Sequence, residues 1–273
     1  MSLKIYQVDA FTSKVFGGNP AAVVPLDAWL PDVAMQAIAA ENNLAETAFF
    51  VPEAGRYGLR WFTPTQEVPL CGHATLASAF VIFTEIDPVL GSVEFSTQSG
   101  TLTVTRAGDL LRMDFPRHAL TEVEAPFSLL VGLRAVPSRV YFVSESPNYY
   151  AVYATEAEIR ALTPEFAEIT QLDALGVIAT APGEDCDFVS RYFAPKLGIP
   201  EDPATGSTHC ALAPYWGERL GKTELFAQQV SVRGGDLFCT VTDQRVLISG
   251  QAALYSRGEI FVSGDVGIEE AWD

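Results

Sequence analysis

Short apolar stretches, most of them alternating with polar residues, recur along the chain and predict a structure rich in strands. The first such stretch is Lys4–Phe11, and Gly17–Pro20 is a turn before the apolar strand Ala21–Val24. Further stretches predict strands at Ala45–Val51, Gly58–Phe62, Ser92–Gln98, Thr101–Arg106 and Leu110–Phe115. The segment 116–137 then predicts a crossover between two domains.

Three stretches have the apolar spacing of helices. Asp32–Asn42 places Ala and Met on one inner face. Residues 74–83 are apolar on every side, which predicts a helix buried inside a lobe. The stretch 208–220 is similar but contains Pro214, which we expect to kink or interrupt that helix.

The second half of the chain repeats the first at a nearly constant offset, which indicates an internal duplication. The matching pairs are Asn19–Val24 with Asn148–Tyr153, Leu44–Pro52 with Ala174–Pro182, Arg60–Pro64 with Arg191–Pro195, and Leu102–Leu111 with Phe238–Leu247. We therefore predict an α+β fold of two pseudo-symmetric lobes, each a mixed, mostly antiparallel sheet wrapped around a central helix. The N-terminal lobe is expected at residues 1–118 and the C-terminal lobe at 119–273, with the last strand able to pack back on the N-terminal lobe.

The two central helices begin in the same way. Gly72 opens the first, after Glu67, and Gly206 opens the second, after Glu201. A helix N-terminus presents unpaired N–H groups and about half a positive charge, so two converging starts would form a socket for a carboxylate in a cleft between the lobes. Alternatively, both glycines only allow tight packing of their loops.

The composition narrows the classes of function. The chain has 34 acidic and 17 basic residues and a net charge of −17, which disfavours binding to nucleic acid. No apolar run reaches the length of a membrane span and the N-terminus does not resemble a signal peptide, so we expect a cytoplasmic protein without membrane contact. Four cysteines form no CxxC pair, which argues against disulfides and zinc ribbons.

The most informative positions are those where the repeat fails. Glu46 lies in an apolar strand, and its counterpart in the second half is Gly176. A carboxylate that faces inward there is suited to carry a proton. Alternatively, Glu46 is an exposed residue at a strand end.

Three polar residues accompany the helix starts. His73 follows the first glycine and could contact a substrate oxygen, or it is satisfied by the backbone. Ser207 follows the second glycine and is a cap or a minor contact rather than a nucleophile. Asp202, whose counterpart is Val68, is a second asymmetric carboxylate, or it caps the turn before Pro203.

A metal site would use Cys71, His73, His209 and Cys210. We do not expect one, because adjacent helical residues such as His209 and Cys210 point in different directions.

Four motifs together resemble the phenazine-biosynthesis PhzF-like family of isomerases: Gly17–Pro20, Ala45–Thr47, Cys71–Thr75 and Asp202–Ser207. The resemblance covers essentially the whole chain, in order. It implies the diaminopimelate-epimerase-like fold, commonly a homodimer, with no metal or organic cofactor. It also implies that Glu46 is the catalytic acid and base, that His73 and Asp202 beside the substrate are catalytic residues too, and that Gly72, Gly206 and Ser207 bind the substrate.

The expected function is therefore a cofactor-independent isomerase that moves a proton on a small carboxylate-bearing substrate. One alternative is a two-base epimerase or racemase of the same fold, which would use a thiol at each helix start. Cys71 aligns with Thr205 rather than with a second cysteine, which disfavours it. The other alternative is a non-catalytic protein that binds a small anion.

Overall fold

The computed structural model describes residues 1–262, which divide into two compact units. Unit 1 holds residues 1–16, 20–113 and 251–262, and unit 2 holds 17–19 and 114–250. Among the described residues, no helix is both long enough and apolar enough to cross a membrane.

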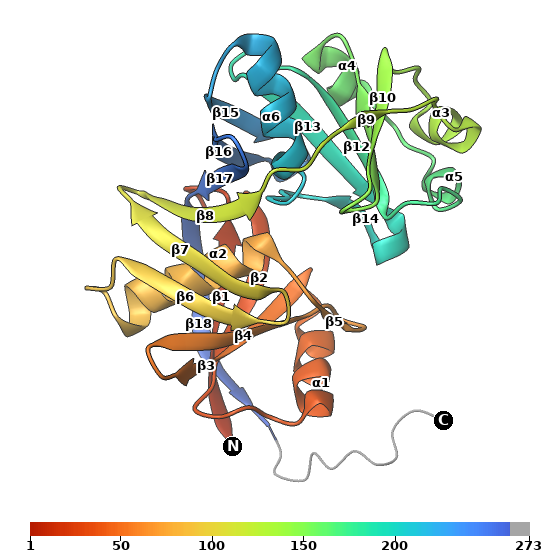
Figure 1. The fold of residues 1–273 in the computed structure, drawn as a ribbon. Helices are drawn as coiled ribbons and strands as arrows, with labels where there is room; N and C mark the ends of the chain where they lie inside the picture. Colours follow the sequence, from red (N-terminus) through yellow and green to blue (C-terminus); the bar gives the residue numbers. More distant parts are fainter. Residues whose placement is uncertain (263–273) are drawn as a thin grey trace. The chain divides into compact units, whose positions relative to one another are not determined.

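Unit 1 is a mixed sheet with two helices (Figure 1). Its elements are β1 (Ser2–Ala10), β2 (Asn19–Pro25), α1 (Asp32–Asn42), β3 (Glu46–Glu53), β4 (Arg56–Phe62), β5 (Glu67–Val68), α2 (Gly72–Val81) with the π-helical turn η1 (Ile82–Ile86), β6 (Ser92–Thr97), β7 (Gly100–Ala107), β8 (Leu110–Pro116) and β18 (Ala252–Phe261).

Unit 2 has the same character. Its elements are β9 (Thr121–Glu122), α3 (Phe127–Leu133), β10 (Arg139–Val143), β11 (Asn148–Val152), α4 (Glu156–Ala161), α5 (Phe166–Ile169), β12 (Gly176–Pro182), β13 (Phe188–Ala194), η2 (Pro195–Leu197), β14 (Ile199–Asp202), α6 (His209–Leu220), β15 (Glu224–Gln229), β16 (Gly235–Val241) and β17 (Arg245–Gly250). The segment expected as a plain crossover, 116–137, thus contains a short strand and a helix.

The strand pairings of unit 1 recur in unit 2. β2 pairs parallel with β3 as β11 does with β12, and β4 pairs parallel with β6 as β13 does with β15. The remaining repeated pairs are antiparallel: β3 with β4, β4 with β5, β6 with β7, β12 with β13, β13 with β14, and β15 with β16. The predicted α+β fold with its mixed, mostly antiparallel sheets is therefore confirmed.

The registers of the two central hairpins agree residue by residue. Thr47 faces Phe62 and Ala48 faces Trp61 in unit 1. Val177 faces Phe193 and Ile178 faces Tyr192 in unit 2. A slip of one residue would turn every side chain to the opposite face, so this agreement reflects the same hydrophobic pattern in both halves.

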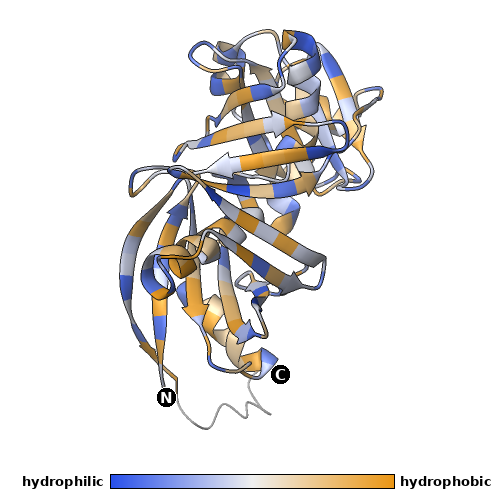
Figure 2. Ribbon diagram, turned by 60° about the vertical axis from the view of Figure 1, so that its left-hand side comes forward, coloured by the Kyte–Doolittle hydropathy of each residue, from blue (hydrophilic) through white to orange (hydrophobic). Residues whose placement is uncertain are grey.

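Each unit has one helix that its sheet encloses. In α2 every residue from His73 to Ala79 is buried, and in α6 every residue from His209 to Pro214 is buried. Figure 2 shows the alternation of apolar and polar residues along the strands. A helix that is apolar on all sides is stable only in such an enclosure.

An arginine holds the strand that leads to each helix. Arg60 on β4 forms two hydrogen bonds of 2.7 Å with Glu67 on β5. Arg191 on β13 forms the equivalent pair with Glu201 on β14, at 2.7 and 2.9 Å. The arginines lie over the rings of Phe62 and Phe193, at 5.1 and 4.8 Å, so the clamp is part of the repeat.

The expected interruption at Pro214 is wrong, because α6 continues through it to Leu220. Proline lacks the N–H that would bond the carbonyl of Cys210 four residues earlier. The His118 N–H donates to that carbonyl at 3.0 Å, so the acceptor is satisfied by the crossover segment and the helix is preserved.

The failed repeat at Gly176 has a steric cause and yields a first prediction. A Cβ at Gly176 would lie 2.3 Å from the Phe193 carbonyl oxygen and 2.8 Å from the Tyr192 ring. We expect Gly176→Ala to lower the free energy of unfolding by about 1–3 kcal/mol or more in urea denaturation. Gly258→Ala is the matched control, because it lies in a strand with no atom within 4 Å of its Cβ, and it should change stability by less than about 0.5 kcal/mol. Equal stability of the two variants would refute the steric explanation.

Candidate functional site

The six predicted site residues divide between the units. Glu46, Gly72 and His73 belong to unit 1, and Asp202, Gly206 and Ser207 belong to unit 2. We therefore describe two groups of residues, each within its own unit.

In unit 1 the structure brings Glu46 and His73 into contact. Glu46 is the first residue of β3 and His73 is the second residue of α2. Glu46 Oε2 lies 3.0 Å from His73 Nε2, and the two side chains are only 12% and 7% exposed. The alternative of an exposed Glu46 is therefore wrong.

The Glu46 carboxylate can still accept a hydrogen bond beside its ion pair with His73. Glu46 Oε2 is buried and receives no well-aligned hydrogen bond from the residues that the structure describes, although Nε2 is close to it. Buried carboxylate oxygens normally accept hydrogen bonds. Each carboxylate oxygen has two lone pairs, so Glu46 keeps acceptor capacity beside its contact with His73.

Cys71 completes this group on the other side of the imidazole. Its Sγ lies 3.5 Å from His73 Nδ1. Burial raises the pKa of the Cys71 thiol to about 11, and the Glu46 carboxylate adds to this effect. Cys71 is thus a neutral thiol near pH 7 and a poor base.

Electrostatics favour a charged His73. Burial alone would lower its pKa, but Cys71 and Glu46 outweigh burial and hold the pKa well above its usual value of 6.5. The Glu46 carboxylate is the cause that operates near neutral pH, where the thiol is uncharged. The pair is therefore a carboxylate beside an imidazolium.

Glu46, Cys71 and His73 have ligand atoms within 4.8 Å of one another, which raises the question of a metal. Cys71 Sγ is nearer to Nδ1 than to Nε2, at 3.5 against 4.0 Å, whereas Glu46 contacts Nε2. One ion binds only one imidazole nitrogen. The arrangement fits a chain of polar contacts better than a metal centre.

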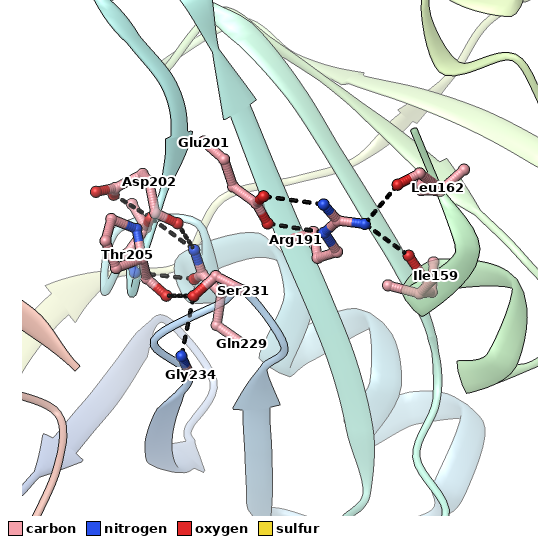
Figure 3. Close-up of polar contacts among 10 residues, drawn as sticks. Ile159, Leu162, Arg191, Glu201, Asp202, Thr205, Gln229, Ser231 and Gly234 are labelled. Carbon is pink, nitrogen blue, oxygen red and sulfur yellow. Dashed lines mark hydrogen bonds and ion pairs between the residues drawn. The ribbon is translucent and has the colours of Figure 1, made fainter. Parts of the chain in front are cut away.

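In unit 2 Asp202 anchors the loop before α6 (Figure 3). Its Oδ1 accepts a hydrogen bond of 2.8 Å from Asn19 Nδ2, and its Oδ2 accepts one from the Thr205 hydroxyl. Both contacts favour the role as a turn anchor that the sequence had left open. The loop that carries Gly206 and Ser207 is thereby fixed.

Gln229 also holds this loop, although it lies outside it, and sequence reasoning did not identify it. Its Oε1 accepts from the Thr205 N–H at 2.9 Å, and its Nε2 donates to the Asp202 carbonyl at 2.6 Å. It is the last residue of β15, far from the loop in sequence and in no motif. Only the fold brings it there.

The predicted motif 17–20 is held by Arg233, which sequence reasoning also missed. Its guanidinium donates to the carbonyls of Gly17 and Gly18, both at 2.8 Å. The Gly18 N–H donates to the Gly234 carbonyl at 2.9 Å. This motif thus positions Asn19 against Asp202.

His209 has a structural environment. Its Nδ1 contacts the Thr205 carbonyl at 2.9 Å, and the ring lies 5.6 Å from that of Phe188. Burial lowers its pKa to about 4, so the ring is neutral. A carbonyl only accepts, so Nδ1 carries the proton.

The pKa shifts of His73 and His209 predict that the two side chains titrate in opposite directions from pH 6.5. In a ring-nitrogen NMR titration, His73 should remain protonated above pH 7, whereas His209 should remain neutral down to about pH 4. The unfolded chain binds a proton at each site near pH 6.5. The stability that the charged His73 contributes is thus present below pH 6.5 and is lost as the pH rises through the folded pKa of His73. The stability that the neutral His209 contributes is present above pH 6.5 and is lost as the pH falls toward 4. A neutral His73 at pH 6 would contradict the ion pair.

Comparison with known proteins places this geometry in context. The family model of the phenazine biosynthesis-like proteins (PhzC-PhzF) matches residues 8–258. A Pseudomonas aeruginosa protein named as an uncharacterized isomerase is 51% identical over 260 residues, which cover 95% of this chain and 99% of that protein.

Solved structures agree with this match. A protein of the PhzF family from Enterococcus faecalis has a TM-score of 0.93 at 46% identity, covering 96% of this chain and 100% of that one. A hydroxyproline epimerase from Agrobacterium vitis has a TM-score of 0.61 at 10% identity, covering 97% and 96%, and shares the fold alone. The predicted diaminopimelate-epimerase-like fold is confirmed.

Proposed function

Because the chain belongs to the phenazine biosynthesis-like family, we propose that it is an isomerase that moves a proton on a small carboxylate-bearing substrate, with Glu46 as the acid and base. The observation that carries the proposal is the buried Glu46 oxygen, which is paired with His73 but keeps a position open for a proton. A single carboxylate in such a site can accept a proton from carbon and return it.

The chemistry follows from the states of the two side chains. The Glu46 carboxylate takes a proton from a carbon next to a carbonyl or conjugated system, and the electron pair of the broken C–H bond moves into that system. The resulting negative charge is stabilised by the His73 imidazolium. Glu46 then returns the proton to a different carbon, so substrate and product have the same composition and no cofactor is needed.

The remaining predicted residues are assigned to binding. Gly72 is the first residue of α2, and Gly206 and Ser207 lie in the loop just before α6, where backbone N–H groups suit a carboxylate. Asp202 orients the second of these loops through Asn19 and Thr205. A thermal-shift screen of small carboxylic acids would identify ligands, since one at 100 times its Kd adds about 2.7 kcal/mol.

Glu46→Gln tests the central role. The amide keeps the shape of the carboxylate but cannot accept the proton, so the variant should bind a ligand found by the screen almost normally and lose turnover by about 10⁴-fold or more. Glu53→Gln, on the same strand but exposed, is the control and should keep full activity. An active Glu46→Gln enzyme would remove Glu46 from the mechanism.

Deuterium labelling of the transferred hydrogen gives a second test of Glu46 as the only base. Substrate deuterated at the departing carbon and converted in ordinary water should give product that retains part of the deuterium, because one shielded carboxyl carries it. Complete loss of the label in the first turnovers would indicate two separate bases.

Cys71→Ser distinguishes this proposal from a two-thiol epimerase. The protonated thiol of Cys71 contacts His73, and a serine hydroxyl can replace that contact. We expect Cys71→Ser to retain most of the turnover, and likewise Cys210→Ser, whose buried thiol has a pKa raised to about 12 by burial. A loss of about 10³-fold in either correctly folded variant would support a thiol base instead.

A further inference from the structure

A pocket lies entirely within unit 2, between the crossover segment and α6. It has a volume of about 630 Å³ and is lined by residues 117–120, by Tyr141 of β10 and, on α6, by Ala211, Pro214, Tyr215, Glu218 and Arg219. None of its lining residues belongs to the predicted site. Its size is in the range of pockets for small molecules.

The crossover segment and α6 form two sides of this pocket, and a contact that Pro214 makes possible joins them. Pro214 leaves the Cys210 carbonyl without a helical donor, and the His118 N–H replaces that donor. The crossover is thereby fastened to one turn of α6. Ala211 and Pro214, which line the pocket beside this contact, are too small to fill the space.

Two arginines in the pocket have no carboxylate partner. Arg117 and Arg219 are exposed, and within the part of the chain that the structure describes neither forms an ion pair. Arginines that do pair with a carboxylate include Arg56, Arg60, Arg134, Arg139, Arg160, Arg191, Arg245 and Arg257. The pocket also holds the carboxylate of Glu218, so its two arginines leave it with a net positive charge, which favours an external anion in a chain with twice as many acidic as basic residues.

The pocket also has an aromatic wall. Tyr141 and Tyr215 meet edge to face at 5.4 Å, and the Arg219 guanidinium lies 4.3 Å from the centre of the Tyr215 ring. Arg219 thus extends along an apolar surface and ends in a charge. A ligand that matches both features has a flat apolar body and an anionic group.

His118 Nδ1 is buried and makes no well-formed hydrogen bond with the described residues. The Tyr215 hydroxyl is also buried, and Tyr141 and Arg219 interact with it. Burial, followed by nearby Tyr141, raises the pKa of Tyr215 to about 12, so its hydroxyl stays protonated and can donate.

We propose that this pocket is a second ligand site, which binds a small planar organic anion such as an aromatic carboxylate. Arg117 and Arg219 bind the carboxylate, Tyr141 and Tyr215 contact the ring, and His118 Nδ1 with the Tyr215 hydroxyl bind polar substituents. The site is independent of Glu46 and of the reaction proposed for it.

Trp216 provides the readout, because its ring lies 5.2 Å from that of Tyr215. We would titrate the full chain with 2-hydroxybenzoate and follow tryptophan fluorescence, with Trp216→Phe to assign the signal and calorimetry to confirm binding. We expect saturable binding, and at least tenfold weaker binding of 2-hydroxybenzamide, which has nearly the same shape without the charge. Binding should persist in Glu46→Gln.

Variants then locate the site. Arg117→Gln and Arg219→Gln should each weaken binding at least tenfold, and Tyr215→Phe should weaken it severalfold by removing one hydroxyl. Arg134→Gln, an exposed arginine of unit 2 outside the pocket, is the matched control and should leave affinity unchanged. Thermal unfolding of each variant would confirm that it is folded.

Four outcomes would overturn the proposal. These are absence of saturable binding, equal affinity for the acid and the amide, affinity that is insensitive to both arginines, or binding that is lost in Glu46→Gln. If binding is absent and Arg117→Glu dissociates a dimer in size-exclusion chromatography, a second copy of the chain occupies the pocket and the ligand proposal fails.

Discussion

The bidentate arginine–glutamate contact is the interaction on which the rest of each unit depends. Arg60 with Glu67 and Arg191 with Glu201 join the second strand of a hairpin to the short strand that leads into the central helix. Each arginine also reaches the helix outside the sheet. Arg60 bonds Asp32 at the start of α1, and Arg191 bonds the carbonyls of Ile159 and Leu162 at the end of α4.

These contacts explain why the loops before α2 and α6 can carry polar groups at all. The side chains of the clamps are only 12–23% exposed, so breaking one partner would leave a largely desolvated charge. The fork geometry of arginine fixes both the distance and the direction of the short strand. The short strand that leads into each central helix is therefore fixed relative to the sheet by two hydrogen bonds.

Duplication of this scaffold allows the two halves to differ where the chemistry requires it. The Glu46 position has room for a carboxylate beside His73, whereas the backbone and ring of β13 leave no room for a side chain at Gly176. The corresponding loop in unit 2 uses Asp202 for internal hydrogen bonds. One half therefore carries the carboxylate that we propose as the proton-transfer group, and the other carries a loop of fixed backbone.

Local patterns predicted the fold well, because they are set by neighbours in sequence. Helix α1 has the predicted bounds, Asp32–Asn42, and the hairpins of the two predicted copies have matching registers. Contacts between distant segments were not predictable. Pro214 alone indicates a break, and only the fold shows that the His118 N–H replaces the missing donor. Gln229 and Arg233 likewise act on loops far from them in the chain.

The charge of the chain gives a reason for the partner of Glu46. A substrate carboxylate that approaches an isolated, buried glutamate would be repelled by a like charge, and at 4 Å that repulsion is about 4 kcal/mol at an effective dielectric constant of 20. His73, held as an imidazolium, makes the pair formally neutral, while the other lone pairs of the Glu46 carboxylate remain able to accept. The Glu46 carboxylate can then coexist with an anionic substrate in a protein with a net charge of −17. In the reaction that we propose, the same imidazolium would be stabilised further when the electron pair of the C–H bond moves into the substrate, so that one ion pair would serve both binding and proton transfer.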